Sequence, residues 1–382
     1  MKNKIPYGGH YIDNSDVSSV LKSLKGKLIT TGKFVDKFEN KVKKNLKSKY
    51  VLSCNSGTSA LHLSFCAAGL KEGDVVIMPS INFISAYSMA TSFGAKIFLT
   101  DVDPQTGQMT PKNLLECIKK FKLKKIKIIL TMYMGGYPEN VYDFYKIKKK
   151  FSSILIEDAC HAFGAKYLVN NKYYPVGSCK HADISTFSLH PLKPITTGEG
   201  GLLSTNNKKY FNLAKTFRSH GIIRSKNHWN YDIQKAGYNY RISDINCALG
   251  VSQLKKIKIF FQKRKKIYDY YKKELNGFKN LVSFPKYSKN IKPSYHLIII
   301  NINFKKLNDK EKFIEYILRK NIIFQFHYKP IFTFTVYDGA KQKYPSAIKY
   351  YNTSLSIPIF HQISLKEVKY IIKIIKKYIS KY

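Results

Sequence analysis

The chain has 382 residues, of which 44% are hydrophobic and 24% charged, with a formal net charge of +42 at pH 7. This length suits two domains or one large one, because single cores stop growing near ~250–300 residues. No run approaches the ~20 apolar residues of a membrane span, and the N-terminus lacks the apolar segment of a signal peptide. Six scattered cysteines without a CxxC pair favour reduced thiols, so we expect a cytoplasmic protein.

The positive charge comes almost entirely from lysine. Of the 66 lysines and arginines, five are arginines. Proteins that read nucleic acids rely on arginine forks, whereas abundant Lys, Ile, Asn and Tyr together are typical of an AT-rich genome. A functional polycation is the alternative. We expect no specific nucleic-acid partner, only weak binding that falls steeply with salt, although a basic surface would attract anionic nucleotide substrates.

Strands and helices alternate along the first 250 residues. Apolar runs predict strands at residues 74–78, 95–100, 125–130, 153–158, 183–188 and 200–205, and helical patterns lie at 81–94, 111–121 and 139–151. This alternation predicts an α/β fold with a mostly parallel sheet. A long helical pattern follows at 243–275, then a strand at 296–304 and helices at 311–320 and 366–379. We therefore expect a large domain at 1–250, and a linking helix with a smaller α+β domain at 251–382.

Three polar clusters stand where strands are expected to end, which is where open α/β sheets place their sites. The first is CNSGTSALHL, residues 54–63, in which a turn of small residues opens an amphipathic helix. Free amides at a helix start, with hydroxyls beside them, can cradle an anion. Alone, the pattern also fits an ordinary helix cap.

The second cluster is ILIEDACHAFGA, residues 154–165. Glu157 and Asp158 close an apolar strand, and His161 follows within one turn. A carboxylate in such a place is costly unless it is paired, so it could bind a metal, a ribose or a protonated ring nitrogen. A lone histidine of this kind is often structural.

The third cluster is FSLHPLKPITTGEGG, residues 187–201. An expected strand delivers Ser188 to its end, and Lys193 follows between two prolines. The prolines restrict the backbone and fix where the lysine points, as a nucleophilic lysine requires. By itself the stretch also fits a surface lysine in a proline-rich loop.

Taken in order, the three clusters meet the needs of pyridoxal phosphate. Its phosphate needs amides and hydroxyls, its pyridine nitrogen needs an acid, and its aldehyde needs a lysine for a Schiff base.

With these residues in hand, the chain resembles the DegT/DnrJ/EryC1/StrS family of sugar-nucleotide aminotransferases. The resemblance runs nearly end to end and includes PYG at 6–8, LITTGKFVDKFE at 28–39, SGTSALHL at 56–63, EDACHAFGA at 157–165, FRSHG at 217–221 and GYNYRISDINCALG at 237–250. It implies the type I, aspartate-aminotransferase-like fold with a smaller α+β C-terminal domain, and pyridoxal 5′-phosphate as the cofactor.

The resemblance also implies roles for single residues. Lys193 is expected to form the Schiff base and to shuttle the proton, and Asp158 to pair with the pyridine nitrogen. His161 stands where relatives contact the ring hydroxyl. Phe83 stands where an aromatic residue stacks on the ring, with core packing as the alternative.

Two further expectations concern the phosphate and the subunits. Gly57, Thr58 and Ser188 correspond to residues that hold the phosphate. Asn239 resembles an asparagine that reaches the phosphate of the neighbouring subunit, which implies a homodimer with composite sites.

The expected substrate and its contact residues follow from the same resemblance. The stretches HPLKPITTGEGG, GVSQLKK (250–256) and FHYKPIF (326–332) resemble family members that aminate UDP-2-acetamido-2,6-dideoxy-β-L-arabino-hex-4-ulose toward pseudaminic acid, with L-glutamate as amino donor. The expected sugar-nucleotide contacts are Tyr7, Lys27, Leu28, Ile29, Thr30, His327, Tyr328 and Lys329. For Tyr7 and Lys27 an ordinary surface position is the alternative.

Other activities stay open from sequence. The chain could aminate another UDP-, dTDP- or GDP-linked keto sugar, including those of bacillosamine or legionaminate pathways, or act as a non-catalytic pyridoxal-phosphate-binding regulator. Lys193 argues against the dehydratases of the family, in which a histidine replaces the lysine. Asn82, where relatives often have threonine, and the variable segment 132–141 are not expected to touch the central chemistry.

Overall fold

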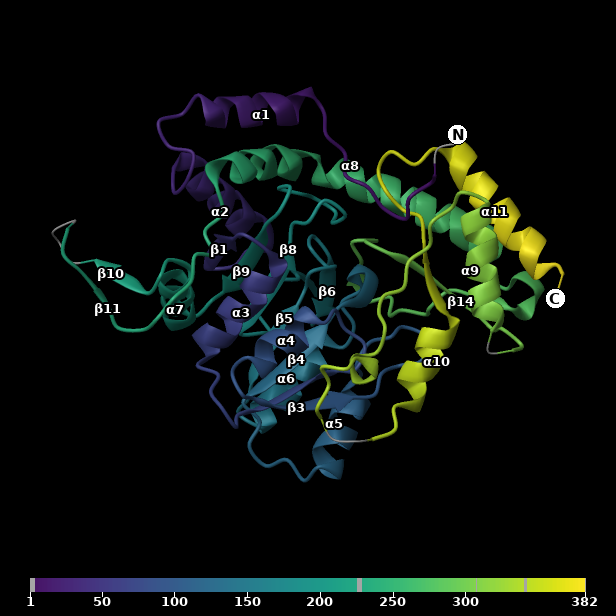
Figure 1. The fold of residues 1–382 in the computed structure, drawn as a ribbon, viewed down its shortest axis with the longest axis horizontal. Helices are drawn as coiled ribbons and strands as arrows, with labels where there is room; N and C mark the ends of the chain where they lie inside the picture. Colours follow the sequence, from purple (N-terminus) through teal and green to yellow (C-terminus); the bar gives the residue numbers. More distant parts are fainter. Residues whose placement is uncertain (1–3, 225–228, 307, 340–341, 382) are drawn as a thin grey trace.

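Figure 1 shows the computed structural model of the chain, which describes residues 4–224, 229–306, 308–339 and 342–381. Its centre is a seven-stranded sheet. The strand order is β1 (Tyr50–Cys54), β9 (Gly201–Thr205), β8 (Ile184–Ser188), β5 (Ile154–Asp158), β4 (Ile128–Met132), β2 (Val75–Pro79) and β3 (Lys96–Thr100). The five strands from β8 to β3 are mutually parallel, and β9 runs antiparallel to both of its neighbours. The predicted α/β fold with a mostly parallel sheet is confirmed.

Helices cover both faces of this sheet. On one face Val76 and Ile128 pack in the core that α3 (Gly57–Ala68), α4 (Ser85–Thr91) and α7 (Lys208–Arg218) complete. On the other face Ile77 and Ile129 pack with α5 (Pro111–Lys120) and α6 (Val141–Lys150). Neighbouring residues face opposite sides because side chains alternate along a strand. Fully apolar strands are typical of parallel sheets buried on both faces.

The N-terminal helices join the long helix α8 (Asp244–Leu275). Both α1 (Asn14–Leu24) and α2 (Lys33–Leu46) pack along α8. Asp244 at the start of α8 accepts hydrogen bonds from the backbone N–H of Gly32 and of Phe34 at 2.6 and 2.7 Å. A two-stranded ribbon, β10 (Ile222–Arg224) and β11 (Tyr231–Ile233), projects away from the body (Figure 1).

The C-terminal part has its own sheet, in the order β12 (Val282–Ser283), β14 (Ile298–Ile302) and β15 (Ser354–Ile357). It carries α9 (Asp309–Arg319), α10 (Pro345–Thr353) and α11 (Leu365–Ile379), with 3₁₀ turns at Phe278–Asn280 and Ile331–Thr333. Another 3₁₀ turn, Met134–Gly136, follows β4 in the large-sheet part. Another strand, β13 (Ile291–Lys292), pairs with β6 (Lys166–Val169), which pairs with β7 (Lys172–Pro175).

The two parts of the chain interlock. The N-terminal Ile5 lies in the apolar core of the C-terminal part, where its backbone N–H donates to the carbonyl of Asn321 at 2.8 Å. Conversely, Tyr344 and Tyr350 are buried in the core of the large sheet. The division at residue 250 falls inside α8 and stays a prediction. In the described part of the chain, no helix is long and apolar enough to cross a bilayer.

Candidate active site

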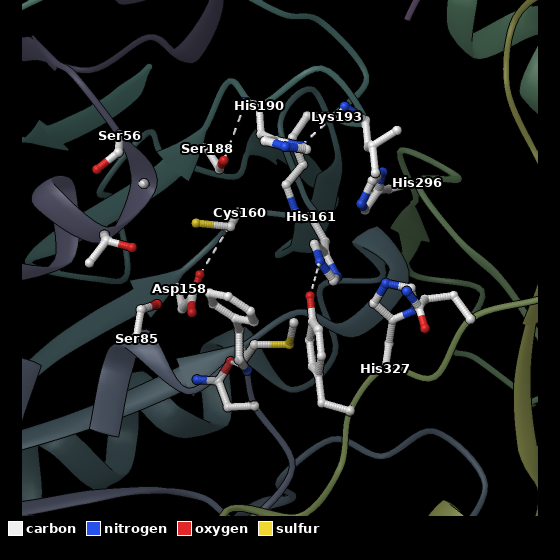
Figure 2. Close-up of a pocket in the computed structure, with 18 of the residues that line it drawn as sticks. Ser56, Ser85, Asp158, Cys160, His161, Ser188, His190, Lys193, His296 and His327 are labelled. Atoms are coloured by element: carbon white, nitrogen blue, oxygen red, sulfur yellow. Dashed lines mark hydrogen bonds between the residues drawn. The ribbon is translucent and has the colours of Figure 1, made fainter. Parts of the chain in front are cut away.

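A cavity of about 430 Å³ lies where the large sheet meets the C-terminal part. Its lining includes residues that follow the carboxyl ends of β1, β2, β4, β5 and β8, because parallel strands end at one edge of a sheet. Figure 2 shows these groups converging on one space. Ten of the sixteen expected site residues line it: Tyr7, Gly57, Thr58, Phe83, Asp158, His161, Ser188, Lys193, His327 and Tyr328.

One end of the cavity is the start of α3. Ser56 caps this helix by accepting a hydrogen bond from the N–H of Ser59 at 3.0 Å. The first amides of the helix, those of Gly57 and Thr58, have no acceptor within it and lie at the cavity beside Ser188. A Cβ on Gly57 would lie 2.8 Å from Cβ of Ser188, so the close approach requires glycine. This end suits a phosphate group.

Asp158, the last residue of β5, is 3% exposed. Its Oδ1 accepts a hydrogen bond from the N–H of Cys160 at 3.2 Å (Figure 2). Burial raises the pKa of this carboxyl group, and contacts with Cys160, Lys193 and Asn82 oppose that rise. A cation placed beside Asp158 would therefore be strongly bound, since it would relieve a buried charge.

Lys193 ends a tight turn at the wall of the cavity opposite Asp158. Its N–H donates to the carbonyl of His190 at 2.9 Å, and the N–H of Leu192 donates to Nδ1 of His190 at 3.3 Å. Burial lowers the pKa of the Lys193 amine, while Cys160 and Asp158 act in the opposite direction. The uncharged amine, which is the nucleophilic form, is thus populated at lower pH than for a surface lysine.

His161 joins the two parts of the molecule. The N–H of Gly135 donates to its Nδ1 at 3.3 Å, and its Nε2 lies 2.8 Å from the hydroxyl of Tyr328 (Figure 2). Because Nδ1 accepts, the neutral ring carries its proton on Nε2 and donates it to Tyr328. Burial lowers the pKa of His161 well below its usual value, with further lowering by Lys193 and His327, which agrees with a neutral ring. The hydroxyl proton of Tyr328 is then free to point at a ligand.

Phe83 offers the cavity an apolar surface. Its side chain is 52% exposed although it lines the cavity, and its ring centre lies 5.7 Å from that of Tyr328. An exposed aromatic face of this kind suits a planar ring. Core packing, the alternative considered for Phe83, does not describe this exposed position.

The remaining expected residues lie outside this cavity. Lys27, Leu28, Ile29 and Thr30 are exposed near the start of α8, where Thr30 bridges to Ser243. Asn239 is exposed and forms a bridge to Ser219. Lys329 is exposed and its Nζ lies 5.1 Å from the ring centre of Phe334.

Sequence reasoning missed several cavity residues. His296, Gln325 and Phe326 line it from the C-terminal part, and the ring centre of His296 lies 4.5 Å from that of His161. These residues come from segments remote in sequence, whose convergence no local pattern reveals. The other lining residues that were not expected as site residues are Ser56, Asn82, Ser85, Met132, Cys160, His190, Leu192 and Glu199.

Asn82 and the segment 132–141 belong to the site, so the expectation that they do not touch its chemistry was wrong. Asn82 lines the cavity and lowers the pKa of Asp158. Gly135, within 132–141, holds His161 through its N–H. A Cβ on the next residue, Gly136, would lie 1.9 Å from Oγ of Ser294, so this position has room only for glycine.

Comparison with known proteins agrees with this geometry. The model of the DegT/DnrJ/EryC1/StrS aminotransferase family matches residues 10–376. The chain belongs to this family. A relative from Campylobacter jejuni strain 81-176, named UDP-4-amino-4,6-dideoxy-N-acetyl-beta-L-altrosamine transaminase, is 36% identical over 371 residues, covering 96% of this chain and 95% of the relative.

Solved structures of the family have the same fold. PseC from Helicobacter pylori, an aminotransferase involved in the biosynthesis of pseudoaminic acid, superposes with a TM-score of 0.89 at 28% identity, with complete coverage of both chains. The sugar aminotransferase Spr1654 from Streptococcus pneumoniae, in its PLP form, superposes with a TM-score of 0.89 at 25% identity and 99% coverage of each chain. The type I PLP-transferase fold expected from sequence is thus confirmed.

The family implies pyridoxal 5′-phosphate, and the residues of this chain fit it. The start of α3 suits the phosphate, Phe83 the ring face, Asp158 the ring nitrogen and Lys193 the aldehyde. Among the described residues no group of three or more His, Cys, Asp or Glu side chains is arranged to hold a metal ion.

Proposed function

We propose that this enzyme transfers the amino group of L-glutamate to C4 of UDP-2-acetamido-2,6-dideoxy-β-L-arabino-hex-4-ulose, in pseudaminic acid biosynthesis. The observation that carries the proposal is one cavity that holds Lys193, Asp158 and the start of α3, in a chain 36% identical to a transaminase of that kind. The matching stretches in both parts of the chain support the substrate assignment.

Each residue then has a distinct task. Pyridoxal phosphate supplies an aldehyde that accepts the amino group and a ring that withdraws electrons when its nitrogen is protonated. Asp158 holds that proton through its negative charge. Lys193 Nζ would anchor the cofactor through its aldehyde, and the free amine would be the base for the proton on the α-carbon of the donor. Its depressed pKa favours the basic amine that this step requires.

The sugar nucleotide is proposed to enter from the side of the C-terminal part. Tyr7 and His327 line that side, with ring centres 5.7 Å apart. Nδ1 of His327 lies 2.8 Å from Oγ of Ser356, so the imidazole is held in place by a side-chain partner. Tyr328 brings a hydroxyl proton that a carbonyl or hydroxyl oxygen of the sugar could accept.

The donor half of the reaction is tested without any sugar. Enzyme loaded with pyridoxal phosphate is mixed with L-glutamate, and released 2-oxoglutarate is quantified. About one equivalent per site is expected, because the amino group stays on the enzyme when no acceptor is present. If L-glutamine or L-aspartate gave the keto acid and L-glutamate did not, the proposed donor would be wrong.

We also propose that the enzyme is a homodimer with composite sites. Residues 27–30 and Asn239 lie near the same helix start, because the N–H of Asp244 donates to the carbonyl of Ile29 at 2.9 Å and Asn239 shortly precedes Asp244 in the chain. Several apolar side chains of this region are exposed, including Leu28 (61%), Ile29 (51%) and Tyr238 (40%). Such a surface suits a second copy of the chain, whose cavity these residues would complete.

Mixing two inactive variants tests this arrangement. Lys193→Ala and Asn239→Ala proteins are denatured together, refolded in equal amounts and assayed. If Asn239 serves the partner's cavity, half of the dimers are hybrids with one intact site, so about a quarter of wild-type activity should return. No recovery, with each variant folded and the wild type recovering after the same treatment, would place Asn239 in the site of its own chain.

A further inference from the structure

His296 is a buried histidine that reaches the cavity from the C-terminal part, just before β14. It is 4% exposed, yet it lines the cavity, and its ring centre lies 4.5 Å from that of His161 (Figure 2). Its backbone is fixed on both sides, because its N–H donates to the carbonyl of Gly135 at 2.9 Å and its carbonyl accepts from the guanidinium of Arg264 at 3.1 Å. The ring is therefore held in place before any ligand binds.

The ring of His296 differs from its two histidine neighbours in the cavity. Nδ1 of His161 accepts from Gly135, and Nδ1 of His327 lies 2.8 Å from Oγ of Ser356. Nδ1 of His296 is fully buried and has no hydrogen-bond partner among the described residues. Buried N–H groups are rarely left unpaired, so the proton of the neutral ring is assigned to Nε2. Since the ring lines the cavity, this N–H is left for a bound molecule.

The surroundings of His296 favour an anion. Burial lowers the pKa of its ring well below the usual value, and His161, Lys193, Arg264 and His327 lower that pKa further. Arg264 is itself 3% exposed and donates to the backbone carbonyls of residues 295, 296 and 359, which do not neutralise its charge. A hydrogen-bond donor with basic groups around it attracts negative charge.

The amino donor needs such a site. L-Glutamate has two carboxylates, and arginine is the residue best suited to hold a carboxylate. Among the described residues that line the cavity there is no arginine, and the single lysine, Lys193, is assigned to the cofactor. The α-carboxylate is attached to the carbon that gives its proton to Lys193, so it must lie close to that amine. The diphosphate of a sugar nucleotide is separated from C4 by the sugar ring and lies further away.

We propose that the Nε2–H of His296 donates a hydrogen bond to the α-carboxylate of the amino donor and so helps to select an amino acid as donor. The neighbouring ring of His161 does not compete for this carboxylate, because its own Nε2–H is directed to Tyr328. The same contact would hold the keto acid product, which keeps the carboxylate. This inference rests on the proposed function, since it presupposes an α-amino acid as the donor.

The experiment measures the binding of two unreactive ligands to enzyme loaded with pyridoxal phosphate, by ligand-observed NMR. Glutarate has the carboxylates of the donor without its amine, and UDP has the diphosphate without the sugar. Wild type is compared with His296→Phe, which keeps a ring and removes the donor, and with His296→Gln, which returns an N–H. His181→Phe is the matched control, because His181 is 6% exposed and lies outside the described lining of the cavity.

The His296→Phe variant should bind glutarate about tenfold more weakly, the effect of losing one hydrogen bond to a charged group. Its Kd for UDP should change by less than about twofold. The half-saturating concentration of L-glutamate for release of 2-oxoglutarate should rise in parallel with the Kd for glutarate. His296→Gln should recover part of the loss, and His181→Phe should match wild type with both ligands.

The two ligands separate the possible outcomes. Unchanged glutarate binding in His296→Phe, or equal weakening of both ligands, overturns the role proposed for His296. Weakening of UDP alone also overturns it, and assigns the ring to the sugar nucleotide. Wild type that binds neither ligand contradicts the proposed function, and this inference falls with it. Circular dichroism confirms folding of each variant, and His296→Leu provides the same comparison if the phenylalanine variant does not fold.

Discussion

Replacing Lys193 with alanine is expected to lower turnover by at least ~10³-fold, because it removes both the covalent anchor and the base that moves the proton. The measurement is the steady-state rate of amination with L-glutamate as donor. The variant should also lose the absorption band of protein-attached pyridoxal phosphate, since Lys193 is the only lysine among the described residues that line the cavity.

The control for this variant is Lys112→Ala. Lys112 lies on α5 with its side chain 83% exposed, so its loss changes the charge by the same amount without touching the cavity. Wild-type turnover is expected for the control. A Lys193→Ala protein with a rate near that of wild type would contradict the assignment of Lys193 as the cofactor anchor and the base.

The second large effect is expected for Asp158→Asn. The amide cannot hold a proton on the ring nitrogen by charge, so the rate should fall by about 10²–10³-fold, the usual loss when one preorganised electrostatic group is removed. The protein should remain folded, because the replacement has nearly the same shape and relieves a buried charge.

Glu157→Gln is the matched control. Glu157 precedes Asp158 on β5 and faces the opposite side of the sheet, where its carboxylate accepts from the hydroxyls of Tyr133, at 2.6 Å, and Ser185. This variant should keep its turnover and lose about 1–3 kcal/mol of unfolding free energy. The reverse pattern, with Asp158→Asn unstable but active, would show that Asp158 has a structural role and Glu157 the catalytic one.

The large-sheet part of the site could be predicted from sequence because local patterns determine it. Apolar strands that end at Asp158 and Ser188, with βαβ connections between them, bring those residues to one sheet edge. The glycine and hydroxyl residues that open α3 are readable in the same way. Proximity in space therefore follows from strand order, even though the three clusters are far apart in the chain.

The C-terminal contribution could not be predicted with the same detail. Tyr328 meets His161 only because the segment after α9 folds back over the large sheet, a contact between residues 167 positions apart. Asn82 was misjudged because no local pattern shows that this buried residue, just beyond the end of β2, lines the cavity. The ribbon β10–β11 was missed because its strands are three residues each and largely exposed, so no apolar alternation marks them.

The most direct test of the central claim offers the purified enzyme, with pyridoxal phosphate and L-glutamate, two UDP-4-keto-6-deoxy-N-acetylhexosamines that differ in configuration at C5. Products are identified by NMR. Amination at C4 of the L-arabino ketone alone is the predicted result. Preference for the D-xylo ketone, or activity only on dTDP- or GDP-linked keto sugars, would contradict the proposed substrate.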